Sequence, residues 1–199
     1  MKKKIIVEGR FISKFTVPQK YIKDLNNHYE KAKTNLTSYG HRLAGRLDSE
    51  LNIMTLIEKT QAFKYFVKCM NEHIKTSEDF NVCKPGPHHL DINGCWINDM
   101  KEGEYNPPHT HHDGTGWSTV LFLKVPQFID DTKDPHKFKD GQLCFIMNQN
   151  ICHYVTPKVG DFYIFRADHQ HCVMPFKTKK PGDIRRSMSF NFIEVKKDV

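Results

Sequence analysis

The segment Arg185-Arg186-Ser187-Met188-Ser189-Phe190-Asn191-Phe192 alternates polar and large apolar side chains. Successive side chains of a β-strand point to opposite faces. Arg185, Ser187 and Ser189 therefore share one face, and Met188, Phe190 and Phe192 share the other. The pattern predicts a strand that runs from Arg185 to Val195 and packs its apolar face against a core. Arg186 lies on the face opposite Arg185, and we expect its replacement to have a mild effect.

Further short strand candidates precede this one. They cover residues 90–97, 117–125, 142–147 and 162–165, the last following the turn at 157–161. Gly103 marks another turn, and residues 126–140, dense in Asp, Lys and Pro, are typical of a loop. Several short strands with turn signals between them indicate a sandwich or barrel. We expect a double-stranded β-helix, the cupin-like jelly roll, whose mouth can hold a metal and a small ligand.

The first 80 residues have a different pattern. An opening strand is predicted from Lys4 to Phe15, and Pro18 can begin a helix that carries Ile22, Leu25 and Tyr29. Residues 63–74 show one continuous apolar stripe at helical spacing, whereas residues 40–45 read as an irregular linker. We therefore expect a mainly β chain with N-terminal helices (α+β): one domain over 1–199, with helical support at 1–80 and the β-helix core at 88–195.

Composition narrows the functional class. The chain has 199 residues, of which 38% are hydrophobic and 27% charged, an ordinary globular balance. No apolar run approaches the roughly 20 residues that span a bilayer, and the N-terminal apolar run is too short for a signal peptide. We expect a cytoplasmic protein with no membrane partner, whose six scattered cysteines remain thiols.

The net charge of +7 admits two interpretations. Lys177, Lys179 and Lys180 follow the last histidine group and could attract an acidic partner such as nucleic acid. However, the chain has no nucleic-acid-binding motif, and Phe176 is the only aromatic residue beside these lysines that could stack a base. We attribute the charge to solubility and expect no nucleic-acid partner.

Two histidine groups carry the chemical signal: His109-Thr110-His111-His112-Asp113 and His169-Gln170-His171. Side chains two residues apart in a strand share a face, so His111 and Asp113 can act together. A His-x-Asp pair with one distant histidine can occupy one face of an iron(II) octahedron and leave three positions open. His109 with His111 is an alternative pair, and His169 is an alternative to His171. A carboxylate favours His111 and Asp113, because it supplies negative charge to iron(II).

Arg185 suggests what else the site binds. An arginine that points into a barrel of apolar side chains is costly unless it meets an anion. A guanidinium can bind a carboxylate through two parallel hydrogen bonds, and the hydroxyl of Ser187 can add a third.

These segments together resemble the iron(II)/2-oxoglutarate-dependent oxygenases, especially small bacterial and phage members with prolyl-hydroxylase-like cores. The resemblance covers roughly residues 95–193. It is carried by G-x-Y-x-x-x-H-x-H-x-D from Gly103, W-S-T-V-L-F-L from Trp117, P-K-V-G-D-F-Y-I-F from Pro157, H-x-V-x-P from His171 and R-x-S-x-S-F-N from Arg185. It implies a double-stranded β-helix that uses iron(II), 2-oxoglutarate and O2 and releases succinate and CO2. The cytoplasm would then be that of a bacterium, or of the host if the protein is phage-encoded.

The resemblance also assigns residues. His111, Asp113 and His171 match the metal ligands, and Arg185 with Ser187 matches the clamp for 2-oxoglutarate. Asn98 and Tyr105 resemble positions that touch 2-oxoglutarate. The primary substrate would be a protein or peptide side chain, peptidyl proline first, or a small molecule.

Two other classes fit part of the pattern. A metal-dependent cupin that uses no keto acid would share the spacing from Gly103 to His109-x-His111. However, this chain lacks the glutamate that a cupin carries after that pair. A cupin also has no need of Arg185. A non-enzymatic jelly-roll binding module would explain the strands but not the two histidine groups. Iron-dependent binding of 2-oxoglutarate separates the oxygenase from both.

Overall fold

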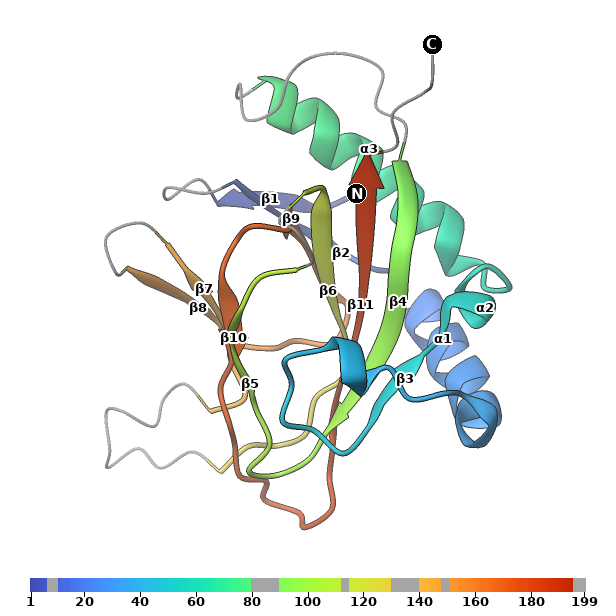
Figure 1. Cartoon of the computed structure of the whole chain (residues 1–199), viewed down its shortest axis with the longest axis vertical. Helices are drawn as coiled ribbons and strands as arrows, with labels where there is room; N and C mark the ends of the chain where they lie inside the picture. The colour runs from blue at the N-terminus through green and yellow to red at the C-terminus, as the bar shows by residue number, and fades with distance from the viewer. Residues whose placement is uncertain (7–10, 80–89, 112–114, 130–139, 148–150, 195–199) are drawn as a thin grey trace.

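Two antiparallel sheets face each other in the computed structural model (Figure 1), which describes residues 1–6, 11–79, 90–111, 115–129, 140–147 and 151–194. Within these residues the larger sheet has the strand order β1-β2-β9-β6-β11-β4-β3, and the smaller has the order β5-β10-β7-β8. The larger sheet contains β1 (Lys3–Ile6), β2 (Ile12–Thr16), β3 (Glu50–Asn52), β4 (Leu90–Met100), β6 (Trp117–Lys124), β9 (Asp161–Arg166) and β11 (Arg185–Glu194). The smaller contains β5 (Asn106–His109), β7 (Leu143–Ile146), β8 (Cys152–Val155) and β10 (His171–Val173). This is the predicted jelly roll.

The helices cover the outer face of the larger sheet (Figure 1). They are α1 (Gln19–Ala32), α2 (Met54–Ile57) and α3 (Ala62–Asp79). Two short 3-10 turns follow α1: η1 (Lys33–Asn35) and η2 (Gly40–Arg42), of which η2 lies at the cavity between the sheets. The apolar stripe of α3, including Phe66 and Met70, packs against Phe162 and Phe190 of the sheet in one core cluster. No described helix is both long and apolar enough to cross a membrane.

A second core cluster lies between the two sheets and leaves room for a cavity. Phe122 from β6 meets Leu143 and Phe145 from β7 there, and Val173 from β10 joins them. The alternation predicted for β11 is confirmed. Met188, Phe190 and Phe192 belong to the helix-side core, whereas Ser187 and Ser189 line the cavity between the sheets. One strand thus supports the core and supplies the site.

The N-terminal part contains the expected helices and more strand than the sequence indicated. The predicted strand Lys4–Phe15 is two strands, β1 and β2, paired antiparallel from Lys3↔Phe15 to Ile6↔Ile12, with residues 7–10 outside the described part. β3, which the sequence did not predict, pairs with β4. The N-terminal residues therefore extend the larger sheet at both edges. The segment predicted as an irregular linker contains η2 and lines the cavity.

The structure describes five of the six cysteines and forms no disulfide between them. Cys69, Cys95, Cys144 and Cys172 are buried, as expected for small apolar residues, and Cys152 is exposed. Cys83 lies outside the described residues.

Candidate active site

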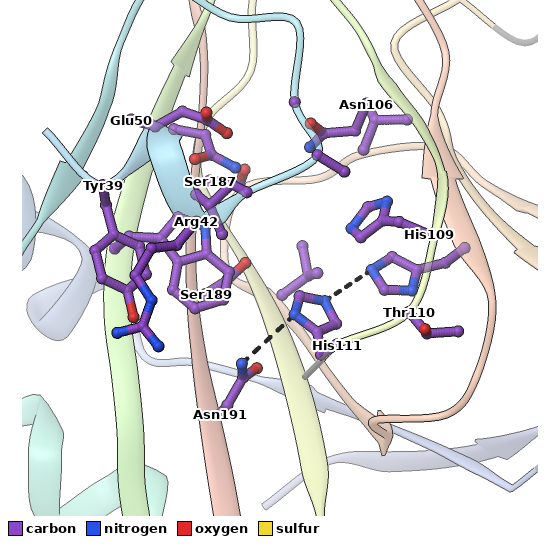
Figure 2. Close-up of a pocket in the computed structure, with 18 of the residues that line it drawn as sticks. Tyr39, Arg42, Glu50, Asn106, His109, Thr110, His111, Ser187, Ser189 and Asn191 are labelled. Atoms are coloured by element: carbon purple, nitrogen blue, oxygen red, sulfur yellow. Dashed lines mark hydrogen bonds between the residues drawn. The ribbon is translucent and has the colours of Figure 1, made fainter. Parts of the chain in front are cut away.

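A cavity of about 240 Å³ lies between the two sheets. Histidines from the β5 end of the smaller sheet and from β10 line one wall, and the serines of β11 line the floor. Figure 2 shows Tyr39, Arg42 and Glu50, all from the N-terminal segment, on the side opposite the histidines. The cavity is therefore shared between the barrel and the first 50 residues.

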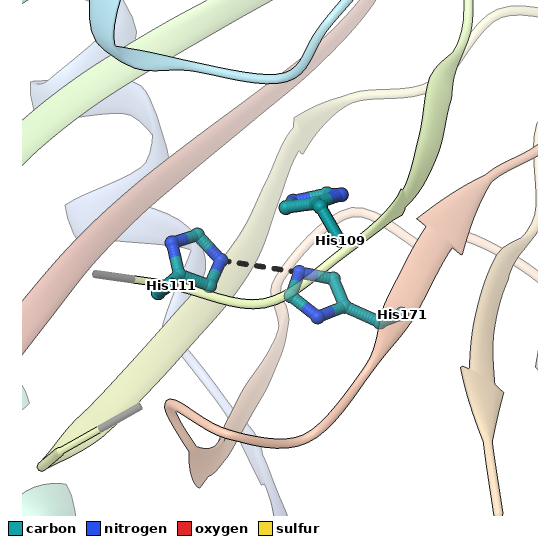
Figure 3. A group of neighbouring side chains, drawn as sticks. All are labelled: His109, His111 and His171. Atoms are coloured by element: carbon teal, nitrogen blue, oxygen red, sulfur yellow. Dashed lines mark hydrogen bonds between the residues drawn. The ribbon is translucent and has the colours of Figure 1, made fainter. Parts of the chain in front are cut away.

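Three histidines meet in this cavity (Figure 3). His109, His111 and His171 bring their ring nitrogens within 4.8 Å of one another. The Nε2 atoms of His111 and His171 are 3.2 Å apart. Two neighbouring nitrogen ligands of an octahedral ion, with bonds of about 2.1 Å, would lie about 3 Å apart. The two imidazoles are thus placed as a pair of metal ligands would be.

Hydrogen bonds orient the rings of His171 and His111. Nδ1 of His171 donates to the backbone oxygen of His169 at 2.9 Å, which leaves the lone pair of Nε2 free for a metal. Nδ1 of His111 lies 3.5 Å from the side-chain amide of Asn191. Burial lowers the pKa of His111 to about 3 and that of His171 well below its ordinary value. Both rings are therefore neutral, the form that binds metal.

His109 is the nearest neighbour of this pair. β5 and β10 pair at His109↔His171, and the two ring centroids are 4.3 Å apart. Nδ1 of His109 donates to the backbone oxygen of Pro107 at 2.7 Å, so its Nε2 is the acceptor. The alternative pair of His109 and His111 thus has geometric support.

Asp113 and His112 lie outside the described residues. His169, the alternative to His171, is buried, but its ring packs against Phe145 at a centroid distance of 5.3 Å and does not line the cavity. Of the four histidines considered as ligands, the structure brings His109, His111 and His171 together. His169, which precedes β10, is not part of this group.

Arg185 is 1% exposed and has no anionic partner among the described residues. Its Nε donates to the backbone oxygen of Gly141 at 3.0 Å, and its Nη1 lies 3.5 Å from the hydroxyl of Ser187. Its Nη2 is buried with no hydrogen-bond partner. Burial lowers the pKa of this guanidinium to about 9. An unpaired buried cation is costly, so the site fits a carboxylate that Nη2 and Ser187 would bind together.

Ser187 and Asn98 lie side by side and both line the cavity. They are cross-strand neighbours in the β11–β4 register. Tyr105, by contrast, is 41% exposed and is absent from the cavity wall, and its backbone pairs with Arg46. The structure therefore brings Asn98 to the predicted 2-oxoglutarate region and does not bring Tyr105 there.

The sequence did not single out residues 39–50, which form the wall of the cavity opposite the histidines. Tyr39 stacks on Trp96 with ring centroids 5.5 Å apart, and Trp96 lies 5.7 Å from His111. Glu50 is 4% exposed and lines the same cavity. Burial, with a smaller contribution from Glu104, raises the pKa of Glu50 from 4.5 to about 7. A lone glutamate in a polar stretch carries no pattern that could have shown this.

The pKa of Glu50 predicts a pH-dependent stability. A carboxyl whose pKa is raised on folding holds its proton more tightly in the folded state, so the wild-type protein loses stability as pH rises from about 4.5 to about 7. Glu50→Gln cannot ionise. We expect its melting temperature to exceed that of the wild type at pH 8 and to match it near pH 4.5. Thermal denaturation from pH 4 to pH 8.5 measures this, and a difference that is constant with pH would contradict it.

Comparisons with known proteins agree with this geometry. Residues 94–191 match the family model described as "Putative 2OG-Fe(II) oxygenase". The fold is similar to a Pseudomonas putida prolyl-4-hydroxylase (TM-score 0.64, 17% identity, covering 96% of this chain and 95% of that one). It is also similar to a Trichoplax adhaerens prolyl hydroxylase in complex with a hypoxia inducible factor peptide fragment (TM-score 0.63, 15% identity, covering 94% of this chain and 84% of that one).

A third similar structure is the viral collagen prolyl hydroxylase of Paramecium bursaria Chlorella virus-1 in complex with 2OG (TM-score 0.57, 12% identity, covering 96% of this chain and 99% of that one). No curated protein sequence matches the chain. At these identities the structures show a shared fold, and the family match covers both histidine groups and the Arg-x-Ser segment. Residues 94–191 therefore belong to the iron(II)- and 2-oxoglutarate-dependent oxygenase family, and the cofactor and co-substrates that this family implies are iron(II), 2-oxoglutarate and O2.

Proposed function

We propose that this oxygenase hydroxylates a protein or peptide side chain, peptidyl proline first, or a small molecule. One observation links the oxygenase reaction to particular residues: two features that this reaction needs lie in the same barrel. One is the facing Nε2 atoms of His111 and His171, and the other is the unpaired buried guanidinium of Arg185. The keto-acid end of 2-oxoglutarate suits a metal held by the histidines, and its distal carboxylate suits the guanidinium of Arg185. The similar fold of peptide-bound and collagen prolyl hydroxylases supports the choice of substrate.

In this proposal His111, Asp113 and His171 hold iron(II). When bound, iron(II) would allow O2 to act as the oxidant: one oxygen atom would go to succinate as 2-oxoglutarate loses CO2, and the other would be inserted into a C–H bond of the substrate. The protein contributes orientation and a dry site. The backbone oxygen of His169 fixes the ring of His171, and the amide of Asn191 faces Nδ1 of His111. Arg185 and Ser187 bind the distal carboxylate, with Asn98 beside them.

We further propose that the chain is a single oxygenase domain whose N-terminal part shapes the substrate cleft, supported by the N-terminal residues that line the cavity. The free thiols of the described cysteines fit the cytoplasmic location expected from the sequence. The proposed partner is a peptide or a small molecule.

The test is iron-dependent conversion of 2-oxoglutarate to succinate. The purified protein would be incubated with iron(II) and 2-oxoglutarate and with peptide, amino-acid and nucleotide libraries in turn. We expect a peptide or amino-acid pool to stimulate succinate formation, and a mass gain of one oxygen atom in the stimulating component. Stimulation by nucleotides alone would overturn the proposed substrate class, and no iron-dependent turnover in any pool would overturn the proposed site.

A further inference from the structure

Glu50 is a buried carboxyl without a partner in the wall of the active-site cavity. It is 4% exposed and faces the cavity from β3. None of the described residues donates a hydrogen bond to it, and its charged neighbour is Glu104, another acid. Figure 2 shows it across the cavity from the histidines. Because Glu50 lines the cavity, a ligand that enters there and supplies hydrogen-bond donors can reach its carboxyl.

Two amide oxygens face the same corner. Oε1 of Glu50 and Oδ1 of Asn106 both border the space beside Gly45. A Cβ atom on Gly45 would lie 2.5 Å from the first oxygen and closer still to the second. Asn98 is the cross-strand partner of Glu50 in the β3–β4 register. The Oδ1 atoms of Asn98 and Asn106 are buried and have no hydrogen-bond partner. The corner therefore presents acceptors from three side chains.

This chemistry does not suit 2-oxoglutarate. Its carboxylates and keto group are acceptors: the amide nitrogen of Asn98 can donate to them, but the carboxylate of Glu50 and the unpaired Oδ1 atoms of Asn98 and Asn106 cannot. A group that matches three acceptors carries several N–H donors and a positive charge. A primary ammonium has three donors and no acceptor, and its hydrogen bonds to a carboxylate are charge-assisted.

Arg42 is the cation of the described chain that lines the same cavity. Its guanidinium lies 5.6 Å from the ring centroid of Tyr39, and it makes no ion pair with Glu50. The structure thus leaves the corner at Glu50 open to an external cation.

We propose that Glu50, with Asn98 and Asn106, forms a subsite that binds a primary ammonium group of the substrate. This inference rests on the proposed function and narrows it: the substrate carries a lysine side chain or another primary amine, and the subsite holds that amine while the carbon to be oxidised faces the histidines. Glu50 acts here in substrate binding and specificity.

Binding is measured first, with n-butylamine as the probe and N-butylacetamide as its neutral match. The full chain, loaded with iron(II) and 2-oxoglutarate without oxygen, is titrated by calorimetry at pH 8. We expect n-butylamine to bind, N-butylacetamide not to bind, and Glu50→Gln to weaken n-butylamine at least about tenfold. Glu58→Gln, which changes an exposed glutamate outside the cavity, should bind like the wild type. Equal binding to Glu50→Gln and wild type, or an equal loss of binding in Glu58→Gln, would overturn the subsite.

Turnover is measured next, with a random peptide library that contains lysine, the same library after ε-acetylation, and free amines including cadaverine and L-lysine. We expect stimulation of succinate formation by amine-bearing pools and its loss on acetylation. Stimulation by the peptide library would identify a lysine side chain as the source of the ammonium group, and stimulation by the free amines would identify a small molecule. Equal stimulation by the acetylated library would overturn the inference and leave the oxygenase function intact. Retained n-butylamine binding with no turnover in any pool would instead overturn the proposed function.

Discussion

We expect that replacing His171 by alanine abolishes iron(II) binding and all 2-oxoglutarate turnover. His171 is 3% exposed, and its Nε2 faces that of His111 at 3.2 Å. The two ligands that remain would hold iron(II) poorly, because the proposed set needs three side chains on one face of the ion. Equilibrium dialysis with iron quantification measures binding, and succinate formation measures turnover. His169→Ala is the matched control. Its backbone oxygen still accepts from His171, and we expect iron binding to survive.

The same assay decides the other two ligands. If His111 and Asp113 bind iron with His171, Asp113→Ala loses iron as completely as His171→Ala, and His109→Ala keeps it. His112→Ala keeps most activity because its side chain should point away from the metal. Loss of iron in His109→Ala together with retention in Asp113→Ala would contradict the His-x-Asp assignment. The centre would then be formed by His109, His111 and His171, the group that the structure brings together.

Removing the guanidinium of Arg185 raises the KM for 2-oxoglutarate by about tenfold to a hundredfold, because a charge-assisted pair is worth about 1.5–3 kcal/mol. Arg185→Met tests this without an empty space in the core. It also removes a buried cation that has no anionic partner in the described chain. We therefore expect the ligand-free variant to melt no lower than the wild type, while 2-oxoglutarate no longer raises its melting temperature. Iron affinity should stay unchanged.

Arg186→Ala is the control for Arg185. The side chain points to the opposite face, as the alternation predicts. There it is 2% exposed, bonded to Asp99 and Glu30, and stacked over Tyr29 at 4.4 Å. Breaking these pairs leaves buried polar groups unpaired, so the mild effect expected from sequence applies to 2-oxoglutarate and not to stability. We expect a lower melting temperature with an unchanged KM. Equal KM changes in both variants would contradict the face assignment of β11.

Local patterns were sufficient for the parts of the site that lie on regular strands. The alternation of residues 185–192 predicted which side chains of β11 face the core and which face the cavity, and the structure confirms it. Period-two alternation is a property of the strand itself, so no distant contact is needed to infer it. The histidine groups were conspicuous for the same reason, since each is continuous in sequence.

Local patterns failed where a strand is short or its partner is distant. β3 has three residues, and its place beside β4 depends on pairing Glu50 with Asn98. β5 contains Pro107 and Pro108, which weaken any strand signal, and it is tolerated because it lies at the edge of its sheet. The position of His109 against His171 follows from that unpredicted strand.

The sequence by itself determined the jelly roll, the oxygenase class and the arginine on the inner face of the last strand, because each depends on alternation or on motifs of neighbouring residues. Only the tertiary structure decided that residues 39–50 close the cavity opposite the histidines and that Glu50 enters it with no hydrogen-bond donor among the residues that the structure describes. The physical reason is that burial and the lack of a hydrogen-bond donor are properties of what surrounds a side chain. Here the surroundings come from strands about 50 residues or more away in the chain.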